Sequence, residues 1–444
     1  MKIHILGICG TFMSGIAILA KKTGHTVTGS DRTAYDPIKS VLDRHNIKVT
    51  IGHKIKDIKN KDLIIIGNVM SRGNPVIEYI LKNELSYTSG PEWLSKNILK
   101  NKQVIAVSGT HGKTTTTTMI AHIMNKLKLN PSYLIGGDPS GTMNSVKLTK
   151  SKYFIIEADE YDTAFFDKRS KFIHYSPNIL VINNIEFDHA DIFKNIDDIK
   201  KSFHHLIRLI PSNGKIIFNS NDRNIKDLLK LGSWSKLISI NTKKTIADYN
   251  LEKSSCYKLK IKNKKYALPN NLIGHHNYIN AAFSLAACNQ ISNKITKQIE
   301  SLKSYKGVKK RMEFIDKINN VEIYDDFAHH PTAIKAAVNS IKNKYRNKKL
   351  LTIFLPNSNS INLGVHNDNL LSSLKHSNFV LVITHNKKLL KYFSNNIKIN
   401  VIECESQIGD YLCNVSKFDN ILILSNKNTE NVIKYIKNEL YRQR

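Results

Sequence analysis

Residues 109–115 read Gly109-Thr110-His111-Gly112-Lys113-Thr114-Thr115. A short apolar run over 103–107 precedes them, and from Thr116 to about Leu127 apolar residues recur at helical spacing. The pattern predicts a strand that turns through glycines into a helix. Such a turn directs several backbone N–H groups and a helix N-terminus at one point, which favours a phosphate group.

Two side chains of this loop are suited to a nucleoside triphosphate. Lys113 would place a positive charge on the β- and γ-phosphates, and the Thr114 hydroxyl would ligate Mg²⁺. The usual G-x-x-x-x-G-K-[ST] spacing requires glycine at position 107, where the chain has Val107. We therefore predict a shorter G-x-x-G-K-T phosphate loop; the alternative is a glycine turn with a solvated lysine.

Composition limits the class of protein. A length of 444 residues with 41% hydrophobic residues is enough for two to four ordinary domains. The net charge of +31 would ordinarily suggest nucleic acid or a membrane surface. The lysines are scattered along the chain among Asn and Ile, without an RNA-recognition, zinc-finger or basic-zipper signature. We expect no specific nucleic-acid partner, and expect the charge to attract polyanionic substrates.

Cysteine usage and hydropathy point to a cytoplasmic protein. The five cysteines are scattered and form no CxxC pair, so a disulfide framework is not expected. The N-terminus enters a strand directly, without a signal peptide, and no apolar run approaches the ~18 residues of a membrane span. We expect no membrane partner.

The N-terminal region is predicted to begin as a βαβ unit. Residues 2–6 form an apolar strand, the glycine-rich turn 7–15 leads into a helix, and a second strand over 26–29 ends at Ser30-Asp31. The glycine spacing is not G-x-G-x-x-G, so a phosphate-bearing nucleotide is favoured over NAD. Asp31 would bind a sugar hydroxyl, or alternatively cap a helix. A domain boundary is expected near residue 100.

Polar residues follow two strands of the central region. The strand 153–156 ends in the acidic run 157–162, and the strand 179–182 is followed by Asp188-His189. Acidic groups at strand ends beside a phosphate loop are where Mg²⁺ ligands belong, so the acidic run and His189 are candidates; the alternative for His189 is a structural role. Further on, Asn277 and Asn280 would share one helix face.

The last region, from about Gly307, alternates strands and helices and predicts a second doubly wound α/β unit. The run Asp325–Pro331 lies at the end of its first strand, the usual place for a ligand contact. The predicted strands are 321–324, 350–355, 379–383, 399–402 and 421–424, and the helices 332–345, 367–375, 386–394 and 429–441.

Taken together, these motifs resemble the Mur ligases, ATP-dependent amide-forming enzymes of peptidoglycan metabolism. The matching blocks are the turn 7–15, the loop 109–115, Asn184-x-x-x-Asp188-His189, Gly274-x-His276-Asn277-x-x-Asn280, Lys310-Arg311 and 325–331. The resemblance implies an α/β protein of three domains. These are a UDP-sugar-binding Rossmann-like domain over 1–100, a central P-loop ATPase-like domain over 101–305 and a C-terminal Rossmann-like domain over 306–444.

Within the family the chain is most similar to the branch of murein peptide ligases. Their substrates are UDP-N-acetylmuramate and the recycled tripeptide L-alanyl-γ-D-glutamyl-meso-diaminopimelate. These enzymes use ATP to form an acyl phosphate and then join the two substrates. Two alternatives stay open: the branch that adds free L-alanine, and a non-catalytic relative that keeps nucleotide and UDP-sugar sites. The blocks that favour the tripeptide branch are 7–13, 157–172, 186–193 and 363–366.

The resemblance also implies roles for single residues, with ATP and Mg²⁺ as cofactors and a monomer or weak homo-oligomer as the assembly. The implied catalytic residues are Lys113, Glu157, His189, Arg311 and Asp326. The implied ATP contacts are Gly109, Thr110, His111, Gly112, Lys113, Thr114, Thr115, Asn277, Asn280, Arg311 and Asp326. The implied UDP-sugar contacts are Gly7, Gly10, Thr11 and Asp31. The implied metal ligands are Thr114, Glu157 and His189.

Three positions depart from the family pattern. Several Mur ligases carry a carbamylated lysine in the helix after Asp-His, where this chain has His204, so no carbamate is predicted. Asn357 stands where an arginine is expected, and Ser14 replaces a common glycine. The polar loop 357–362 and His366 are candidates for recognising the distal part of a peptide, or form an ordinary solvated loop.

Overall fold

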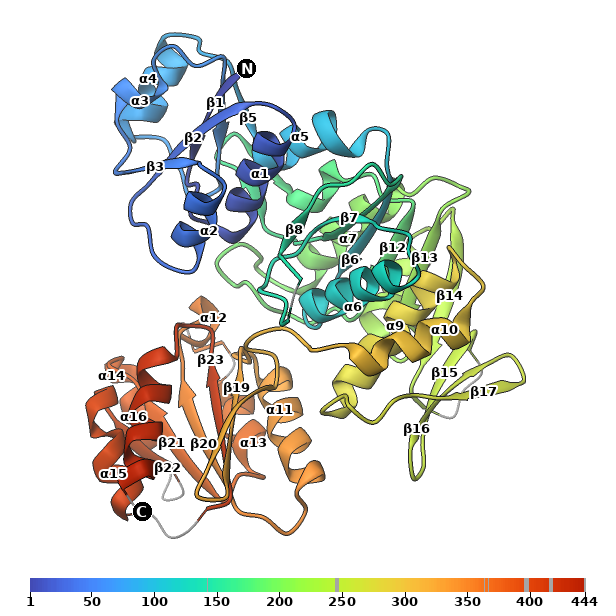
Figure 1. The fold of residues 1–444 in the computed structure, drawn as a ribbon, viewed down its shortest axis with the longest axis vertical. Helices are drawn as coiled ribbons and strands as arrows, with labels where there is room; N and C mark the ends of the chain where they lie inside the picture. The colour runs from blue at the N-terminus through green and yellow to red at the C-terminus, as the bar shows by residue number, and fades with distance from the viewer. Residues whose placement is uncertain are drawn as a thin grey trace. The chain divides into compact units, whose positions relative to one another are not determined.

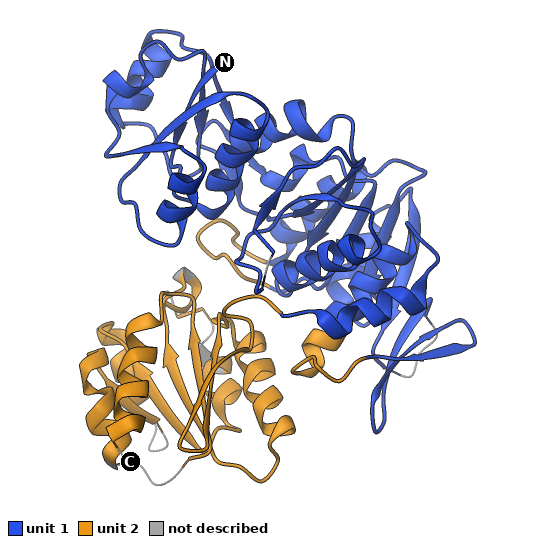
Figure 2. Ribbon diagram, viewed as in Figure 1, with its two compact units in different colours: residues 1–186, 196–268, 280–306 blue, residues 187–195, 269–279, 307–444 orange. Residues whose placement is uncertain are grey.

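The structure is a computed structural model. It describes residues 1–141, 143–243, 247–362, 364–365, 367–394, 399–414 and 418–442. By contacts the chain divides into two compact units (Figure 2). Unit 1 comprises residues 1–186, 196–268 and 280–306, and unit 2 comprises residues 187–195, 269–279 and 307–444.

Unit 1 begins with a parallel sheet of strand order β3-β2-β1-β4-β5, seen in blue in Figure 1. The buried, mostly apolar strands β1 and β4 at its centre are typical of a sheet covered on both faces. The strands are β1 (Lys2–Leu6), β2 (Thr26–Asp31), β3 (Lys48–Ile51), β4 (Leu63–Ile66) and β5 (Tyr87–Ser89). The helices are α1 (Thr11–Lys22), α2 (Ile38–Arg44), α3 (Ile55–Ile58), α4 (Pro75–Lys82) and α5 (Gly90–Leu94), followed by a π-helical turn over Ser95–Leu99.

The second sheet of unit 1 has the strand order β17-β16-β15-β14-β13-β12-β6-β9-β7-β8. Its parallel centre carries the phosphate loop, and an antiparallel β15-β16-β17 meander extends one edge. The strands are β6 (Gln103–Ser108), β7 (Ser132–Leu134), β8 (Val146–Lys147), β9 (Tyr153–Glu157), β12 (Ile179–Ile182), β13 (Lys215–Asn219), β14 (Lys236–Asn241), β15 (Tyr249–Lys253), β16 (Tyr257–Ile261) and β17 (Lys264–Ala267). The helices are α6 (Lys113–Lys126), α7 (Ile196–Arg208), α8 (Arg223–Lys230), α9 (His275–Asn289) and α10 (Ile295–Ser301).

A short hairpin stands apart from this sheet. It pairs β10 (Asp162–Ala164) with β11 (Asp167–Ser170), and a 3₁₀ turn over Lys171–His174 follows. At its tip the Phe166 ring meets the Tyr87 ring edge-on, with centroids 5.0 Å apart. The hairpin thus begins at the acidic run that follows β9, and its tip contacts β5 of the N-terminal sheet in the same unit.

The main sheet of unit 2 has the order β18-β19-β23-β20-β21-β22, with only β18 antiparallel among the described strands. Apolar side chains of α11, α13 and α14 cover one face, and those of α15 and α16 cover the other. The strands are β18 (Glu313–Ile318), β19 (Val321–Asp326), β20 (Leu350–Leu355), β21 (Phe379–Ile383), β22 (Ile399–Ile402) and β23 (Asn420–Ser425). The helices are α11 (Pro331–Lys344), α12 (Asn359–Asn362), α13 (Asn367–Leu374), α14 (Lys387–Ser394), α15 (Ile408–Asn414) and α16 (Glu430–Arg442).

These elements confirm the predicted α/β class and the doubly wound character of the first and last regions. The predicted strands and helices agree with the observed ones to within a few residues at each end. The phosphate loop leads directly into α6, which begins at Lys113 rather than Thr116. Among the described residues, no helix combines the length and apolar character needed to cross a membrane.

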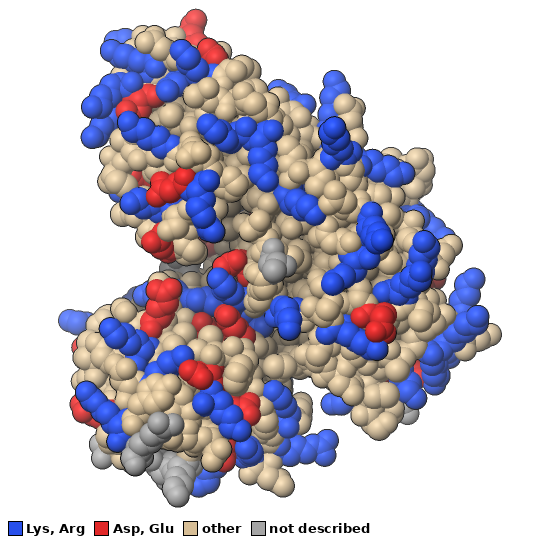
Figure 3. Space-filling view, viewed as in Figure 1, with Lys and Arg blue, Asp and Glu red and all other residues tan. Residues whose placement is uncertain are grey.

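Charge is spread over the molecule. On the face drawn in Figure 3, Lys and Arg side chains are distributed over both units, with Asp and Glu between them, and form no continuous basic patch. This distribution agrees with the scattered lysines of the sequence.

Candidate functional site

The loop between β6 and α6 is built on two glycines in left-handed backbone conformations. Gly109 has φ +125° and Gly112 has φ +81°. A Cβ atom at Gly109 would lie 2.8 Å from the carbonyl oxygen of Asn184, and one at Gly112 would lie 2.5 Å from Oδ1 of Asn280. Both positions therefore require glycine, for backbone conformation and for space. The predicted residue Asn280 lies directly against the loop.

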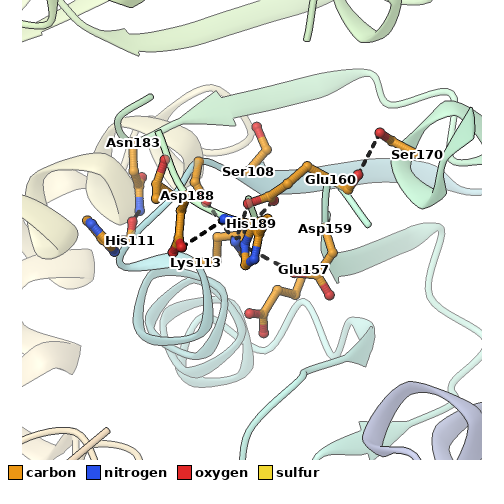
Figure 4. A network of polar contacts seen from close by, with 12 residues as sticks. Ser108, His111, Lys113, Glu157, Asp159, Glu160, Ser170, Asn183, Asp188 and His189 are labelled. Atoms are coloured by element: carbon orange, nitrogen blue, oxygen red, sulfur yellow. Dashed lines mark hydrogen bonds and ion pairs between the residues drawn. The ribbon is translucent and has the colours of Figure 1, made fainter. Parts of the chain in front are cut away.

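Two asparagines that follow β12, Asn183 (Figure 4) and Asn184, hold the loop in place. The Oδ1 atom of Asn184 accepts a hydrogen bond from the His111 N–H at 2.8 Å, and its Nδ2 donates to the His111 carbonyl at 3.1 Å. Asn183 donates to the hydroxyl of Thr116 in α6 at 3.1 Å. The sequence singled out Asn184 only as part of a motif, and gave no signal for Asn183. Together they fix the backbone N–H groups that a phosphate would contact.

Lys113 lies at the first position of α6 and is engaged with carboxylates (Figure 4). Its Nζ donates to the Gly109 carbonyl at 2.8 Å and to Glu160 Oε2 at 3.2 Å, and lies 3.7 Å from Asp159 Oδ1. Burial opposes the charge, but Glu160, Asp159 and Glu157 raise the pKa of Lys113 above its usual value. The lysine is therefore a fixed cation at the centre of the loop.

Glu157, at the end of β9, lies beside Thr114. The Thr114 hydroxyl donates to Glu157 Oε1 at 2.8 Å, and the Gly136 N–H donates to Oε2 at 2.8 Å. Burial, and after it the charge of Asp159, raises the pKa of Glu157, although Lys113 opposes the shift. A hydroxyl and a carboxylate oxygen in contact form the hard-oxygen donor set that Mg²⁺ prefers, so these residues fit the metal.

His189 belongs to the segment 187–195, which is counted with unit 2. Its backbone is left-handed, with φ 56°, and its N–H donates to Asp188 Oδ1 at 2.8 Å. The Ser360 hydroxyl donates to the same oxygen at 2.9 Å. Burial opposes the charge of Asp188, but His189, His330 and His329 lower its pKa to about 2.

Arg311 and Asp326, the other catalytic candidates of unit 2, lie in one compact turn. Asp326 Oδ2 accepts from the Met312 N–H at 2.7 Å, and Oδ1 accepts from the Ala328 N–H at 2.8 Å. The guanidinium of Arg311 lies 5.0 Å from the centroid of the Phe327 ring. Burial raises the pKa of Asp326, and Arg311 opposes that shift.

Asn277, in the first turn of α9, is counted with unit 2, whereas Asn280 is counted with unit 1. Its Nδ2 donates to the Ile273 carbonyl at 2.8 Å. The structure thus confirms that both asparagines are helical, and Asn280 lies against the phosphate loop.

The glycine turn after β1 is closed by residues at the end of β2. Gly7, with φ +77°, donates its N–H to the Ser30 carbonyl at 2.9 Å. Asp31 accepts from the N–H of Cys9 and from its neighbour Arg32, both at 2.8 Å. Asp31 therefore fastens the turn to β2, and its contact with a sugar hydroxyl stays a prediction. Gly10 precedes α1 and Thr11 is its first residue, exposed at the turn.

All three departures can be placed. Ser14 lies buried in α1, where its hydroxyl donates to the Thr11 carbonyl at 3.0 Å. His204 lies buried in α7, with the centroid of its ring 6.2 Å from that of Trp234. Because residue 204 is a histidine, this position has no amine that could be carbamylated. Asn357 is half-buried between β20 and α12. His366 lies outside the described residues, as does Leu363 of the block 363–366.

Comparison with known proteins identifies related chains. Three family models match: the Mur ligase family catalytic domain over residues 2–102, the Mur ligase middle domain over 107–288, and the Mur ligase glutamate ligase domain over 310–425. A Haemophilus influenzae protein named UDP-N-acetylmuramate–L-alanyl-γ-D-glutamyl-meso-2,6-diaminoheptandioate ligase is 41% identical over 86% of this chain and 85% of its own. A UDP-N-acetylmuramate–L-alanine ligase of Clostridium acetobutylicum is 34% identical over 83% and 79%.

A solved structure matches over nearly the whole length. The crystal structure of a murein peptide ligase from Psychrobacter arcticus superposes with a TM-score of 0.76 at 36% identity, covering 99% of this chain and 98% of the other.

Proposed function

The chain belongs to the Mur ligase family, and we propose that it joins UDP-N-acetylmuramate to L-alanyl-γ-D-glutamyl-meso-diaminopimelate at the expense of ATP. The relative that carries this activity in its name is 41% identical to the chain, whereas the L-alanine-adding relative is 34% identical. The observation that carries ATP-dependent ligation is geometric. A buried lysine lies in a glycine loop, next to a carboxylate–hydroxyl pair suited to a metal ion.

The chemistry explains why such a loop is needed. A carboxylate does not react with an amine in water at neutral pH. Transfer of the ATP γ-phosphoryl group to the muramyl carboxylate gives an acyl phosphate; the peptide amine attacks its carbonyl carbon, and phosphate leaves from the tetrahedral intermediate. Lys113 would hold its charge on the transferring phosphoryl group, and the N–H groups fixed by Asn184 would hold the phosphates in line.

We propose that Mg²⁺ accompanies ATP and would be held by Thr114, Glu157 and His189. When bound, it would neutralise phosphate charge as the γ-phosphoryl group transfers. The contact between the Thr114 hydroxyl and Glu157 supports the first two ligands. The assignment of His189 rests on its place in the Asn184-x-x-x-Asp188-His189 motif.

The remaining proposed contacts are grouped by the domain in which they lie and by the substrate that they would bind. We propose the division into domains 1–100, 101–305 and 306–444, with the UDP-sugar in the first, ATP in the second, and the third completing the ATP site. The proposed UDP-sugar contacts are Gly7, Gly10, Thr11 and Asp31. The proposed ATP contacts outside the loop are Asn277, Asn280, Arg311 and Asp326.

The reaction would return recycled peptide to cell-wall synthesis, and so serve cell shape and division. Because UDP-sugars and ATP are polyanions, the surplus of Lys and Arg would favour their approach, and no nucleic-acid or membrane partner is needed to explain it. A cytoplasmic monomer or weak homo-oligomer is sufficient for this role.

A substrate panel tests the proposal. Purified protein is given ATP, Mg²⁺ and UDP-N-acetylmuramate with either the tripeptide or L-alanine, and ADP formation is followed while mass spectrometry identifies the product. We expect kcat/KM to be far higher with the tripeptide, since binding energy from its distal groups positions the amine. A higher kcat/KM with L-alanine would show that the protein has the L-alanine-adding activity instead. Binding of UDP-sugar and nucleotide without ADP formation would assign a non-catalytic relative.

A further inference from the structure

A chain of hydrogen-bonded side chains runs through the N-terminal sheet of unit 1, across the adjacent strands β1, β2 and β3 (Figure 1). His4 in β1 lies fully buried, with Nδ1 2.9 Å from the Thr28 hydroxyl and Nε2 3.2 Å from the Ser30 hydroxyl. The Ser30 hydroxyl is also 2.9 Å from Nδ1 of His53, which follows β3. We call Thr28, His4, Ser30 and His53 the hydrogen-bond chain. The roles assigned so far do not use it.

Burial favours the neutral form of both imidazoles of this chain. Burial, with smaller contributions from Lys61 and His53, lowers the pKa of His4 to about 4, although Asp57 opposes the shift. Burial also lowers the pKa of His53, despite the neighbouring Asp31. A neutral imidazole has one N–H donor and one acceptor nitrogen, so each ring must choose a tautomer.

The single proton of the Ser30 hydroxyl couples these choices. Ser30 lies between two ring nitrogens and can donate to only one of them, so the other ring must donate to Ser30. If the chain runs inward from His53, its last bond is from the Thr28 hydroxyl to the Ile3 carbonyl, which is 3.5 Å long. If it runs outward, Thr28 donates to His4 at 2.9 Å, and the same three contacts of 2.9 to 3.2 Å are made without the bond to Ile3. A hydrogen bond of 3.5 Å is weak, so little energy separates the two directions, and an acceptor atom placed at His53 would select the outward one.

In the outward direction Ser30 donates to Nδ1 of His53, and the proton of His53 therefore resides on Nε2. Among the residues that the structure describes, no side chain or backbone group is recorded as the partner of this nitrogen. His53 is partly exposed, so a ligand can reach its Nε2–H.

The same residues hold the carboxyl ends of three neighbouring strands together. The Ser30 carbonyl accepts from Gly7, and the Asp31 carboxylate accepts from Cys9. The Asp31 carbonyl accepts at 2.7 Å from the N–H of Gly52, the residue that precedes His53. The glycine turn, Asp31 and His53 thus stand side by side at the edge where ligands of such sheets bind.

We propose that the Nε2–H group of His53 donates a hydrogen bond to an acceptor oxygen in the nucleotide part of the UDP-sugar. Ser30 and His4 act as positioning residues, because in the outward direction the Ser30 proton lies on the His53 Nδ1 side and leaves the His53 proton on Nε2. The inference rests on the proposed function, since it takes a uridine nucleotide as the ligand of the first domain. It adds a binding residue that no sequence motif indicated.

Binding of UDP, measured by calorimetry on the full chain, tests this role. The His53→Phe variant keeps a ring but loses the donor, and we expect its Kd for UDP to rise about three- to tenfold, the range for one neutral hydrogen bond. His53→Gln can place an amide N–H near the same point and should lose less. The matched control is His45→Phe, another half-buried histidine of this region, at the end of α2; its Kd should equal that of the unaltered protein.

The tautomer itself is read by ¹⁵N NMR of histidine-labelled protein, with the His53 signals assigned by comparison with His53→Gln. We expect a protonated Nε2 and an unprotonated Nδ1 in the UDP complex, and a change in the His53 signals in Ser30→Ala. A protonated Nδ1 in the complex, or an unchanged Kd in His53→Phe, overturns the inference even if UDP binds normally. Failure of the unaltered protein to bind UDP overturns it together with the proposed UDP-sugar site.

Discussion

Replacing Lys113 by Met tests the phosphate loop and separates its catalytic role from its structural one. The lysine side chain is 11% exposed and its partner Glu160 is 4% exposed, with 3.2 Å between the charged atoms. Lys113→Met therefore leaves a buried carboxylate without its cation, which typically costs about 3–5 kcal/mol of stability. In the same variant, loss of the charge on the transferring phosphoryl group should lower kcat by ~10³-fold.

A second substitution distinguishes the two effects. Adding Glu160→Gln to Lys113→Met removes the uncompensated charge, so the unfolding midpoint in urea should return toward that of the unaltered protein. Activity should not return, because the cation is still missing. Stability is measured by urea unfolding of the full chain, and activity by ADP formation with UDP-N-acetylmuramate and tripeptide. Near-normal turnover in Lys113→Met, or recovery of activity in the double variant, would refute the assignment of Lys113 to the phosphoryl group.

Three further predictions concern the metal, the third domain and pH. Glu157→Gln and His189→Ala should each raise the Mg²⁺ concentration for half-maximal activity and weaken Mn²⁺ binding measured directly; unchanged metal dependence in both would move the metal site elsewhere. Arg311→Ala should lower kcat strongly while the Kd for UDP stays unchanged, as expected for a group that acts on closure; an equal loss of UDP binding would contradict this. Burial raises the pKa of Asp325 to about 6, despite the Thr429 hydroxyl and Lys310. The folded state therefore binds more protons than the unfolded state between pH 4 and 6, and its stability falls as pH rises through this window. Asp325→Asn should stabilise the protein by about 2–3 kcal/mol at pH 7.5 and by much less near pH 4, seen as thermal midpoints at the two pH values; a pH-independent difference would count against a charged, buried Asp325.

The backbone of the phosphate-loop region was predictable because local rules decide it. An apolar strand, glycines at 109 and 112 and a helical pattern after Lys113 each favour the same structure, and both glycines indeed have left-handed conformations. Glu157 was identifiable because it ends a buried strand that lies next to β6.

Contacts that depend on how side chains turn after a strand were not predictable. The acidic run 157–162 offers several carboxylates, and nothing in its order indicates that Glu160 turns inward to Lys113 while Glu157 meets Thr114. The hydrogen-bond chain was hidden for a related reason. Its members lie far apart in sequence, and only the parallel register of β1 and β2 brings His4 opposite Thr28.

No structure was predicted for the lysine-rich run 258–265, which forms much of β16 and β17. Leu259 is fully buried between Lys258 and Lys260, which are half-buried. This is the period-two alternation of a strand with one apolar face, and it was hard to recognise because lysines occupy most of the other positions.

The central claim is that ATP activates the carboxylate of UDP-N-acetylmuramate as an acyl phosphate for attack by the tripeptide. The most direct measurement uses UDP-N-acetylmuramate labelled with ¹⁸O in its lactyl carboxylate, with ATP, Mg²⁺ and the tripeptide, and mass spectrometry of the released phosphate. We expect ADP, the amide product, and one ¹⁸O atom transferred to each phosphate released. Unlabelled phosphate, or ¹⁸O found in AMP, would contradict it.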